Sequence, residues 1–100
     1  MNLSDANLKF AHLEHADLNG ANLSGTKLNP AFLEAAELHS VCLREADISG
    51  ALLNEARHLT QGQVNDATGD FQTRLPQDLC MPRNWHDVTA DWPWACPAPK

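Results

Sequence analysis

A large aliphatic side chain recurs at every fifth position of this chain, from residue 3 to residue 53. From residue 6 onward a small residue, most often alanine, stands two places before each one. A period of five matches neither the 3.6 residues of a helical turn nor the two-residue alternation of a strand, so it indicates a repeat architecture. The large residues are Leu3, Leu8, Leu13, Leu18, Leu23, Leu28, Leu33, Leu38, Leu43, Ile48 and Leu53.

These units resemble the pentapeptide-repeat family, whose motif is A(D/N)LXX. The clearest matches are Ala6-Asn7-Leu8, Ala16-Asp17-Leu18, Ala21-Asn22-Leu23 and Ala46-Asp47-Ile48. The resemblance implies an all-β fold, a right-handed quadrilateral parallel β-helix in which four units, about twenty residues, make one coil. The predicted fold also includes a short C-terminal capping helix and an extended tail after the repeats.

In such a coil the chain turns a corner every five residues, so the large and the small residue of each unit both point inward. Stacking sets Leu13 beneath Leu33 and Leu53, with neighbouring coils about 4.8 Å apart. Glycine adopts positive φ at low cost and therefore suits the corners, as at Gly20, Gly25 and Gly50. The predicted core comprises Leu8, Leu13, Leu18, Leu23, Leu28, Leu33, Leu38, Leu43, Ile48 and Leu53.

The repeat stops at Ala56-Arg57-His58, and signals of a helix follow. Thr60 and Gln63 form the Thr-x-x-Gln pattern of a capping box. With Gly69 as the expected stop, this pattern predicts a short helix at about residues 61–68. A helix of this length is unstable alone in water, so we expect it to pack on the open end of the last coil.

The segment after the repeats resembles a tail often found in the family, of the form LTxxQ, GDxxTxLPxxL and PxxW. We expect Leu75, Leu79 and Trp85 to anchor it across the last coil. The final stretch is rich in proline and has no period, so we expect it to lack fixed structure, although Trp92-Pro93-Trp94 remains a possible docking motif. The predicted organisation is a β-helix at residues 1–58, a capping helix and tail at 59–85, and a disordered terminus at 86–100.

The formal net charge is -6, which argues against direct binding of nucleic acid, because phosphate contacts require clustered Lys and Arg. The chain has no apolar run near the roughly 18 residues that span a bilayer, and no charged-then-apolar signal at its start. We therefore expect a cytoplasmic protein without a membrane partner.

Three cysteines, Cys42, Cys80 and Cys96, form no CxxC pair, and their odd number favours a reducing compartment over a disulfide framework. The histidines lack a recurring thiol or carboxylate neighbour, so we interpret them as surface residues rather than metal ligands. They are His12, His15, His39, His58 and His86. No metal or other cofactor is expected.

Three classes of function follow. A non-enzymatic interaction module or scaffold is favoured, because flat faces lack the concave pockets that hold substrates. The resemblance implies a second class, an acidic DNA mimic that binds type II topoisomerase (DNA gyrase), and residues 1–55 do carry eight acids against three basic residues. An enzyme is the third class, with Cys42 beside Arg44 as its one candidate group. No set of catalytic groups supports that class, and the partner remains open.

Two surfaces are candidate contacts. Stacking at intervals of twenty places the strip residues Phe10, His12, Pro30, Phe32 and Leu52 on one side of a rod that is polar elsewhere, and exposed apolar patches of this kind mark interfaces. The alternative is that the C-terminal tail folds back over this strip. The second surface is the first coil, which opens in repeat register without a capping segment and could self-associate.

Overall fold

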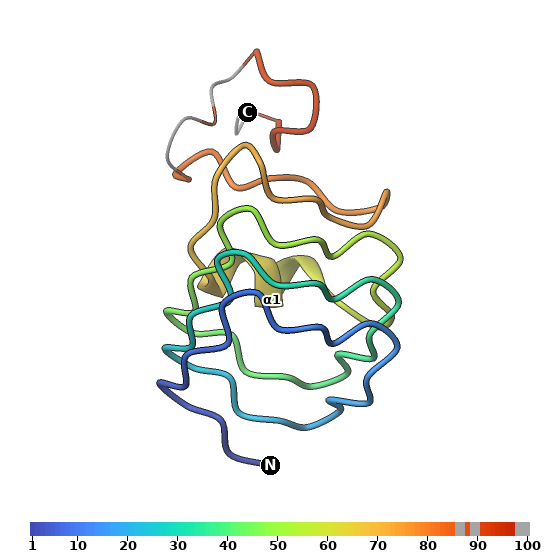
Figure 1. The fold of residues 1–100 in the computed structure, drawn as a ribbon. Coiled ribbons are helices and arrows are strands. Elements are labelled where there is room, and N and C mark those ends of the chain that lie inside the picture. Colours follow the sequence, from blue (N-terminus) through green and yellow to red (C-terminus); the bar gives the residue numbers. More distant parts are fainter. Residues whose placement is uncertain (86–87, 89–90, 98–100) are drawn as a thin grey trace.

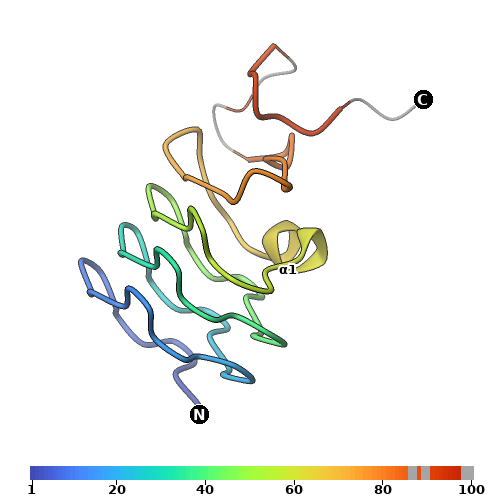
Figure 2. The ribbon, with the colours of Figure 1, turned by 90° about the vertical axis from the view of Figure 1, so that its right-hand side faces the viewer.

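The chain winds into a short stack of four-sided coils, with the N-terminus at one end and the C-terminal segment at the other (Figures 1 and 2). We analysed a computed structural model, which describes residues 1–85, 88 and 91–97. The molecule measures 38 × 21 × 20 Å along its principal axes. No helix in these described residues is long and apolar enough to cross a membrane.

Neighbouring coils are joined by parallel bridges between residues twenty apart. At each bridge one outward residue pairs with both neighbours of the residue below it: the Asn22 N–H donates to the Met1 carbonyl at 2.9 Å, and the Leu3 N–H donates to the Asn22 carbonyl at 2.8 Å. A corner every five residues leaves room for one bridging residue per side, so the described residues contain isolated bridges and no extended strand. The repeat bridges are Asn2–Asn22, Asn7–Lys27, His12–Phe32, Asp17–Glu37, Asn22–Cys42, Lys27–Asp47, Phe32–Leu52 and Glu37–Arg57.

The corners impose a left-handed backbone conformation on the last residue of almost every unit. The glycines expected there have positive φ, between 68° and 75°. The same conformation also holds residues with side chains, at φ between 59° and 65°: Asp5, Phe10, His15, Ala35, Ser40, Glu45 and Glu55. Since such residues disfavour this region, closure of the coil, rather than local preference, sets the corner. Pro30 is the exception, because its ring holds φ negative.

The interior holds one large and one small side chain per side, as the repeat predicts. Leu18, Leu23, Leu28, Leu33, Leu38, Leu43, Ile48 and Leu53 are buried. Leu8 and Leu13 are half-buried, because they lie in the first coil with no coil beneath them. Thr26 is accommodated in a small-residue place because its hydroxyl donates to the Leu23 carbonyl at 2.7 Å.

The helix α1 spans Gln61–Asp66 and lies beside the stack (Figure 2). Its capping box is formed: the Thr60 side chain accepts from the Gln63 N–H, and the Gln63 side chain accepts from the Thr60 N–H. The expected stop at Gly69 is wrong. The helix ends at Asp66, and its C-cap, Ala67, is extended.

Gly69 has a different structural role, since it lies under an aromatic ring. A Cβ at this position would fall 2.6 Å from the Trp85 ring. Trp85 is 4% exposed, and its Nε1–H donates to the Ala67 carbonyl at 3.1 Å. The glycine therefore permits the tryptophan to close the end of the core.

The bridge ladder continues beyond the last repeat. Asp47 pairs with Thr68 and Leu52 with Arg74, so the chain after α1 adds sides to a further coil instead of only lying across the last one. Between them Thr73 is fully buried and donates to the Ile48 carbonyl at 3.0 Å. The expected anchors Leu75 and Leu79 are half-buried against the core.

The C-terminal segment differs from expectation in the residues that the structure describes. Cys80 and Cys96 form a disulfide, so the expectation that the cysteines make no disulfide is wrong for this pair. A parallel bridge between Met81 and Ala95 aligns the two segments that carry them, which the spacing of sixteen residues does not reveal. Cys42 is the free thiol. The expectations for residues 86–87, 89–90 and 98–100, including His86, lie outside the described residues.

Candidate functional site

The strip residues occupy one face of the rod. His12, Phe32 and Leu52 are joined by successive bridges, so they form a column along the stack. The rings of His12 and Phe32 stack with centroids 4.6 Å apart and planes 10° apart. At the adjoining corner Phe10 is 65% exposed and Pro30 is half-buried. The described part of the tail therefore leaves Phe10 open to solvent.

The lower end of the strip carries a polar pair. The His12 Nδ1 lies 3.3 Å from a carboxylate oxygen of Glu14. A hydrogen bond from its own backbone, followed by the one with His12, holds the pKa of Glu14 below its ordinary value. Both side chains are solvent-accessible, so the pair forms a polar rim beside the apolar strip rather than a buried reactive site.

Beyond Leu52, the strip is followed by residues that were not assigned to it from the sequence. Arg74 follows Leu52 in the column through the next bridge. Its guanidinium carbon lies 5.8 Å from the centre of the Trp94 ring. Trp94 in turn packs edge-to-face on Trp92, and Trp92 on Phe71. We call Phe71, Trp92 and Trp94 the aromatic cluster.

The continuation from Leu52 to Arg74 was missed from the sequence because the stacking interval changes after the repeats. Repeat stacking at a constant interval of twenty would place residue 72 above Leu52, but the bridge joins Leu52 to Arg74. The interval is twenty-one at Thr68, just after α1, and twenty-two at Arg74, so one further residue is inserted after the helix. A sequence signal existed in Gly69-Asp70, which the resemblance marks as part of the tail, but the shift itself depends on how α1 packs.

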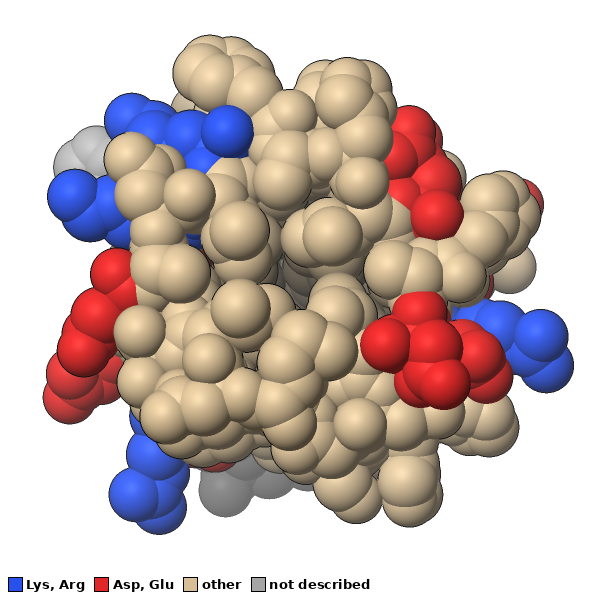
Figure 3. All heavy atoms as spheres, turned by 60° about the horizontal axis from the view of Figure 1, so that its bottom comes forward, with Lys and Arg blue, Asp and Glu red and all other residues tan. Residues whose placement is uncertain are grey.

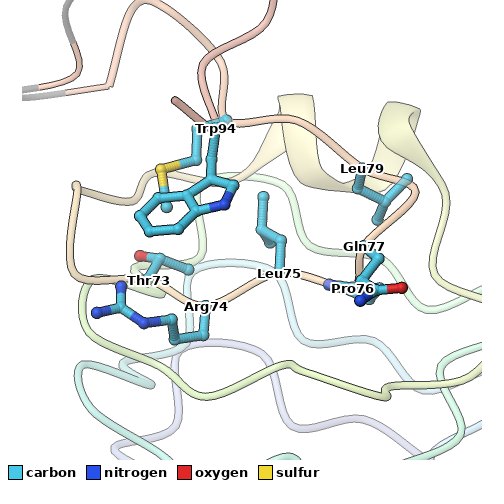
Figure 4. A pocket seen from close by; sticks show the side chains of 8 residues that line it. Thr73, Arg74, Leu75, Pro76, Gln77, Leu79 and Trp94 are labelled. Carbon is cyan, nitrogen blue, oxygen red and sulfur yellow. The ribbon is translucent and has the colours of Figure 1, made fainter. Parts of the chain in front are cut away.

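A cavity of about 180 Å³ opens between the last coil and the C-terminal segment (Figure 4). In Figure 4 the Trp94 ring lies on one side of it, with Leu75 and Leu79 nearby and Arg74 at its margin. Met81, which is buried, also lines it. The full lining is Thr73, Arg74, Leu75, Pro76, Gln77, Leu79, Met81 and Trp94.

The first coil presents a different kind of surface. In the repeats, an outward residue uses its own backbone N–H and C=O to bond the preceding coil. The first coil has no preceding coil, so these groups have no partner within the described residues at Asn2, Asn7, His12 and Asp17. Figure 3 shows that uncharged side chains fill the centre of this end, while acidic and basic side chains lie around its margin. This end therefore combines an unpaired edge with half-buried leucines.

The described residues offer little for catalysis. Cys42, the thiol considered above, is half-buried in an outward place. The rings of His39 and His58 meet edge-to-face with centroids 5.9 Å apart. Within residues 1–85, 88 and 91–97 no group of three His, Cys, Asp or Glu side chains could hold a metal ion.

Comparison with protein-family models identifies the same five-residue repeats. The family model for pentapeptide repeats matches eight copies, at residues 2–29 and 16–54. No curated protein matches the chain in sequence. Among solved structures, the chain is similar to alr5209, a pentapeptide repeat protein from Nostoc Pcc 7120, with 26% identity, a TM-score of 0.26 and coverage of 77% of this chain and 75% of that one.

The repeat match and the stacked coils agree in position, because the matched units end at residue 54 and the twenty-residue bridges end at Arg57. The chain belongs to the pentapeptide-repeat family.

Proposed function

We propose that this protein is a non-enzymatic interaction module, and that a protein partner binds the strip of Phe10, His12, Pro30, Phe32 and Leu52. The observation that supports this proposal is the exposure of Phe10, at 65%, beside a bridged column that contains the apolar residues Phe32 and Leu52. Large apolar side chains with a polar rim are typical of interface cores. The right-handed winding that the family implies forms part of the same proposal.

A rigid rod suits this role energetically. His12, Phe32 and Leu52 are bridged to neighbouring coils, and the Phe10 N–H donates to the Pro30 carbonyl, so little backbone freedom remains to be lost on binding. The stacked rings of His12 and Phe32 also restrict each other's rotamers. Binding energy is therefore concentrated in a few preorganised aromatic contacts, as in interface hot spots.

Phe32→Glu tests the proposal, with Cys42→Glu as a matched control. Both residues occupy outward, half-buried places; Phe32 is bridged to the coils on both sides of it, and Cys42 is bridged to the coil below it. We expect both variants to keep the melting behaviour of the parent, and a partner retained by the parent and by Cys42→Glu to be lost with Phe32→Glu. Equal retention by all three proteins, or a loss of several kcal/mol of stability specific to Phe32→Glu, would contradict the proposal.

Self-association through the first coil is a second proposal. The unpaired N–H and C=O groups of this edge favour it, since exposed edges pair with other chains. Asn7→Pro removes one edge donor without changing a core residue. We expect light scattering to show concentration-dependent dimers for the parent and fewer for Asn7→Pro. A parent that stays monomeric up to millimolar concentration would exclude this contact.

Binding to type II topoisomerase as an acidic DNA mimic is the alternative function. The negative charge of residues 1–55 favours it. Against it, charges of both signs share the outward columns, as in Asp17, Glu37 and Arg57. Unchanged supercoiling by DNA gyrase at micromolar protein would dispose of the alternative.

A further inference from the structure

The cavity between the last coil and the C-terminal segment has apolar walls supplied by both. Leu75 and Leu79 come from the chain that follows the last coil, and Met81 and Trp94 come from the loop that the Cys80–Cys96 disulfide closes. Trp94 is held in place by its backbone: the Met81 N–H donates to the Trp94 carbonyl at 2.7 Å, and the Cys96 N–H donates to the Met81 carbonyl at 2.8 Å. The backbone that carries this wall is therefore fixed, although the ring itself is 55% exposed.

A cation stands at the margin of this cavity. One guanidinium nitrogen of Arg74, Nη1, donates to the carbonyls of Phe71 and Gln72 at 3.3 and 3.2 Å. The guanidinium also lies near the face of Trp94, as cation–π contacts require. No acidic side chain in the described residues lies within ion-pair distance of it. Its other two nitrogens make no hydrogen bond within the same residues and could receive a carboxylate.

We propose that this cavity binds an apolar group that carries a carboxylate, with the apolar part against Leu79, Met81 and Trp94 and the carboxylate on Arg74. The volume of about 180 Å³ suits this ligand, because an apolar cavity of about 150 Å³ is known to hold benzene. The site shares no residue with the strip, so it goes beyond the proposed function.

Neighbouring acids fix the orientation of the ligand. Glu55 lines a hollow that shares Leu75 and Pro76 with the cavity, and Asp78 lines another that shares Leu79 and Trp94. A carboxylate placed towards either one would be repelled. Arg74 is the cation of the cavity lining, so the ligand's carboxylate has one favourable position.

Two sources can supply this chemistry. One is a free aryl or alkyl carboxylic acid. The other is the C-terminal residue of a polypeptide, where an apolar side chain lies next to the terminal carboxylate. Both present an apolar body within a few bonds of a negative charge, and the experiment below separates them.

The first arm uses 4-phenylbutyrate and its uncharged analogue 4-phenylbutanol, with binding followed by saturation-transfer NMR and by tryptophan fluorescence. We expect the acid to bind about tenfold or more tightly than the alcohol, because the carboxylate forms a charged hydrogen bond with Arg74 and the alcohol does not. Arg74→Gln should remove this preference, and Arg74→Lys should restore part of it. Arg83→Gln, an exposed arginine outside the cavity lining, should retain it in full.

The second arm uses the peptide acetyl-Ala-Ala-Phe with a free carboxyl terminus and the same peptide as its amide. A free-acid peptide that binds more tightly than 4-phenylbutyrate identifies a polypeptide C-terminus as the ligand, and the reverse order identifies a small acid. Trp94→Ala should weaken both acids, because it removes one wall. The proposal is overturned if no acid gives saturable binding, if the uncharged analogues bind equally well, or if Arg74→Gln keeps the preference.

Discussion

The repeat coils and the C-terminal part close the same core by different means. In the repeats, each side is held by its own five residues and by two backbone hydrogen bonds to the coil below, as at Asn22. After the repeats, backbone bridges continue at Thr68 and Arg74, and single side chains hold other positions. The Gln63 amide donates to the carbonyls of Leu38 and Val41, both at 2.9 Å. In the repeats, the Ala21 carbonyl accepts from the backbone N–H of Cys42 in the next coil. At Val41, the equivalent position one coil higher, the carbonyl accepts from the Gln63 side-chain amide instead.

A second glutamine extends this contrast. The Gln61 amide donates to the Cys80 carbonyl at 2.9 Å, and its oxygen accepts from the Cys80 N–H at 3.0 Å. One side chain thus fastens the segment that bears the disulfide to α1. Stability in the repeats is spread over many equivalent contacts, as expected for solenoids, whereas the C-terminal part depends on a few contacts that occur once.

The largest effect is expected at a repeat leucine in the middle coil. Leu33 is 1% exposed, so Leu33→Ala removes buried methyl groups and leaves a cavity. We expect it to lower the free energy of unfolding by about 2 to 5 kcal/mol, measured by denaturant titration. A loss of unfolding free energy below about 1 kcal/mol would show that the middle coil repacks around the missing methyl groups. It would also contradict the contrast drawn between the repeats and the C-terminal part.

Trp85→Ala probes the C-terminal part in the same assay. It removes a ring that is 4% exposed and the hydrogen bond to the Ala67 carbonyl. We expect a loss of about 3 kcal/mol, accompanied by exposure of the end of the core. A much smaller loss of unfolding free energy would mean that the Trp85 ring does not cover the end of the core.

Gly69→Ala sharpens the comparison, with Gly20→Ala as its counterpart in the repeats. A methyl group at Gly69 would overlap the Trp85 ring, so we expect a loss of about 1 to 3 kcal/mol. At Gly20 no atom lies within 4 Å, and the cost of about 1 to 2 kcal/mol comes from the backbone, at φ 75°.

A double substitution separates these two causes. Adding Trp85→Leu should suppress the cost at Gly69 and leave the cost at Gly20 unchanged in a double-mutant cycle. An equal reduction of the stability cost at both glycines would show that the cost at Gly69 does not come from contact with the Trp85 ring.

The sequence predicted what is local or periodic. The inward leucines, the twenty-residue register and the capping box of Thr60 and Gln63 all follow from residues near one another or at a fixed interval. It failed where distant residues meet. The end of α1, the place of Gly69 under Trp85, and the Cys80–Cys96 disulfide each require knowledge of how the chain after the repeats turns back.

The same division applies to the candidate sites. The strip could be read from stacking at twenty, because Phe32 and Leu52 lie within the periodic part. Its continuation to Arg74 could not, since α1 changes the interval. The cavity was also beyond reach, because its walls combine residues 73–81 with Trp94, and no pattern in the sequence links them.

The column of His12, Phe32, Leu52 and Arg74 presents side chains at a regular spacing to any partner that lies along it. Its steps are the coil spacing, about 4.8 Å, while the turns of an α-helix rise by about 5.4 Å. A helix laid parallel to the column therefore drifts by about 0.6 Å at each coil. Across the three steps from His12 to Arg74 the mismatch stays under about 2 Å, within the reach of side-chain adjustment. A rod of this length can thus be followed by a helix from end to end, whereas a much longer one could not.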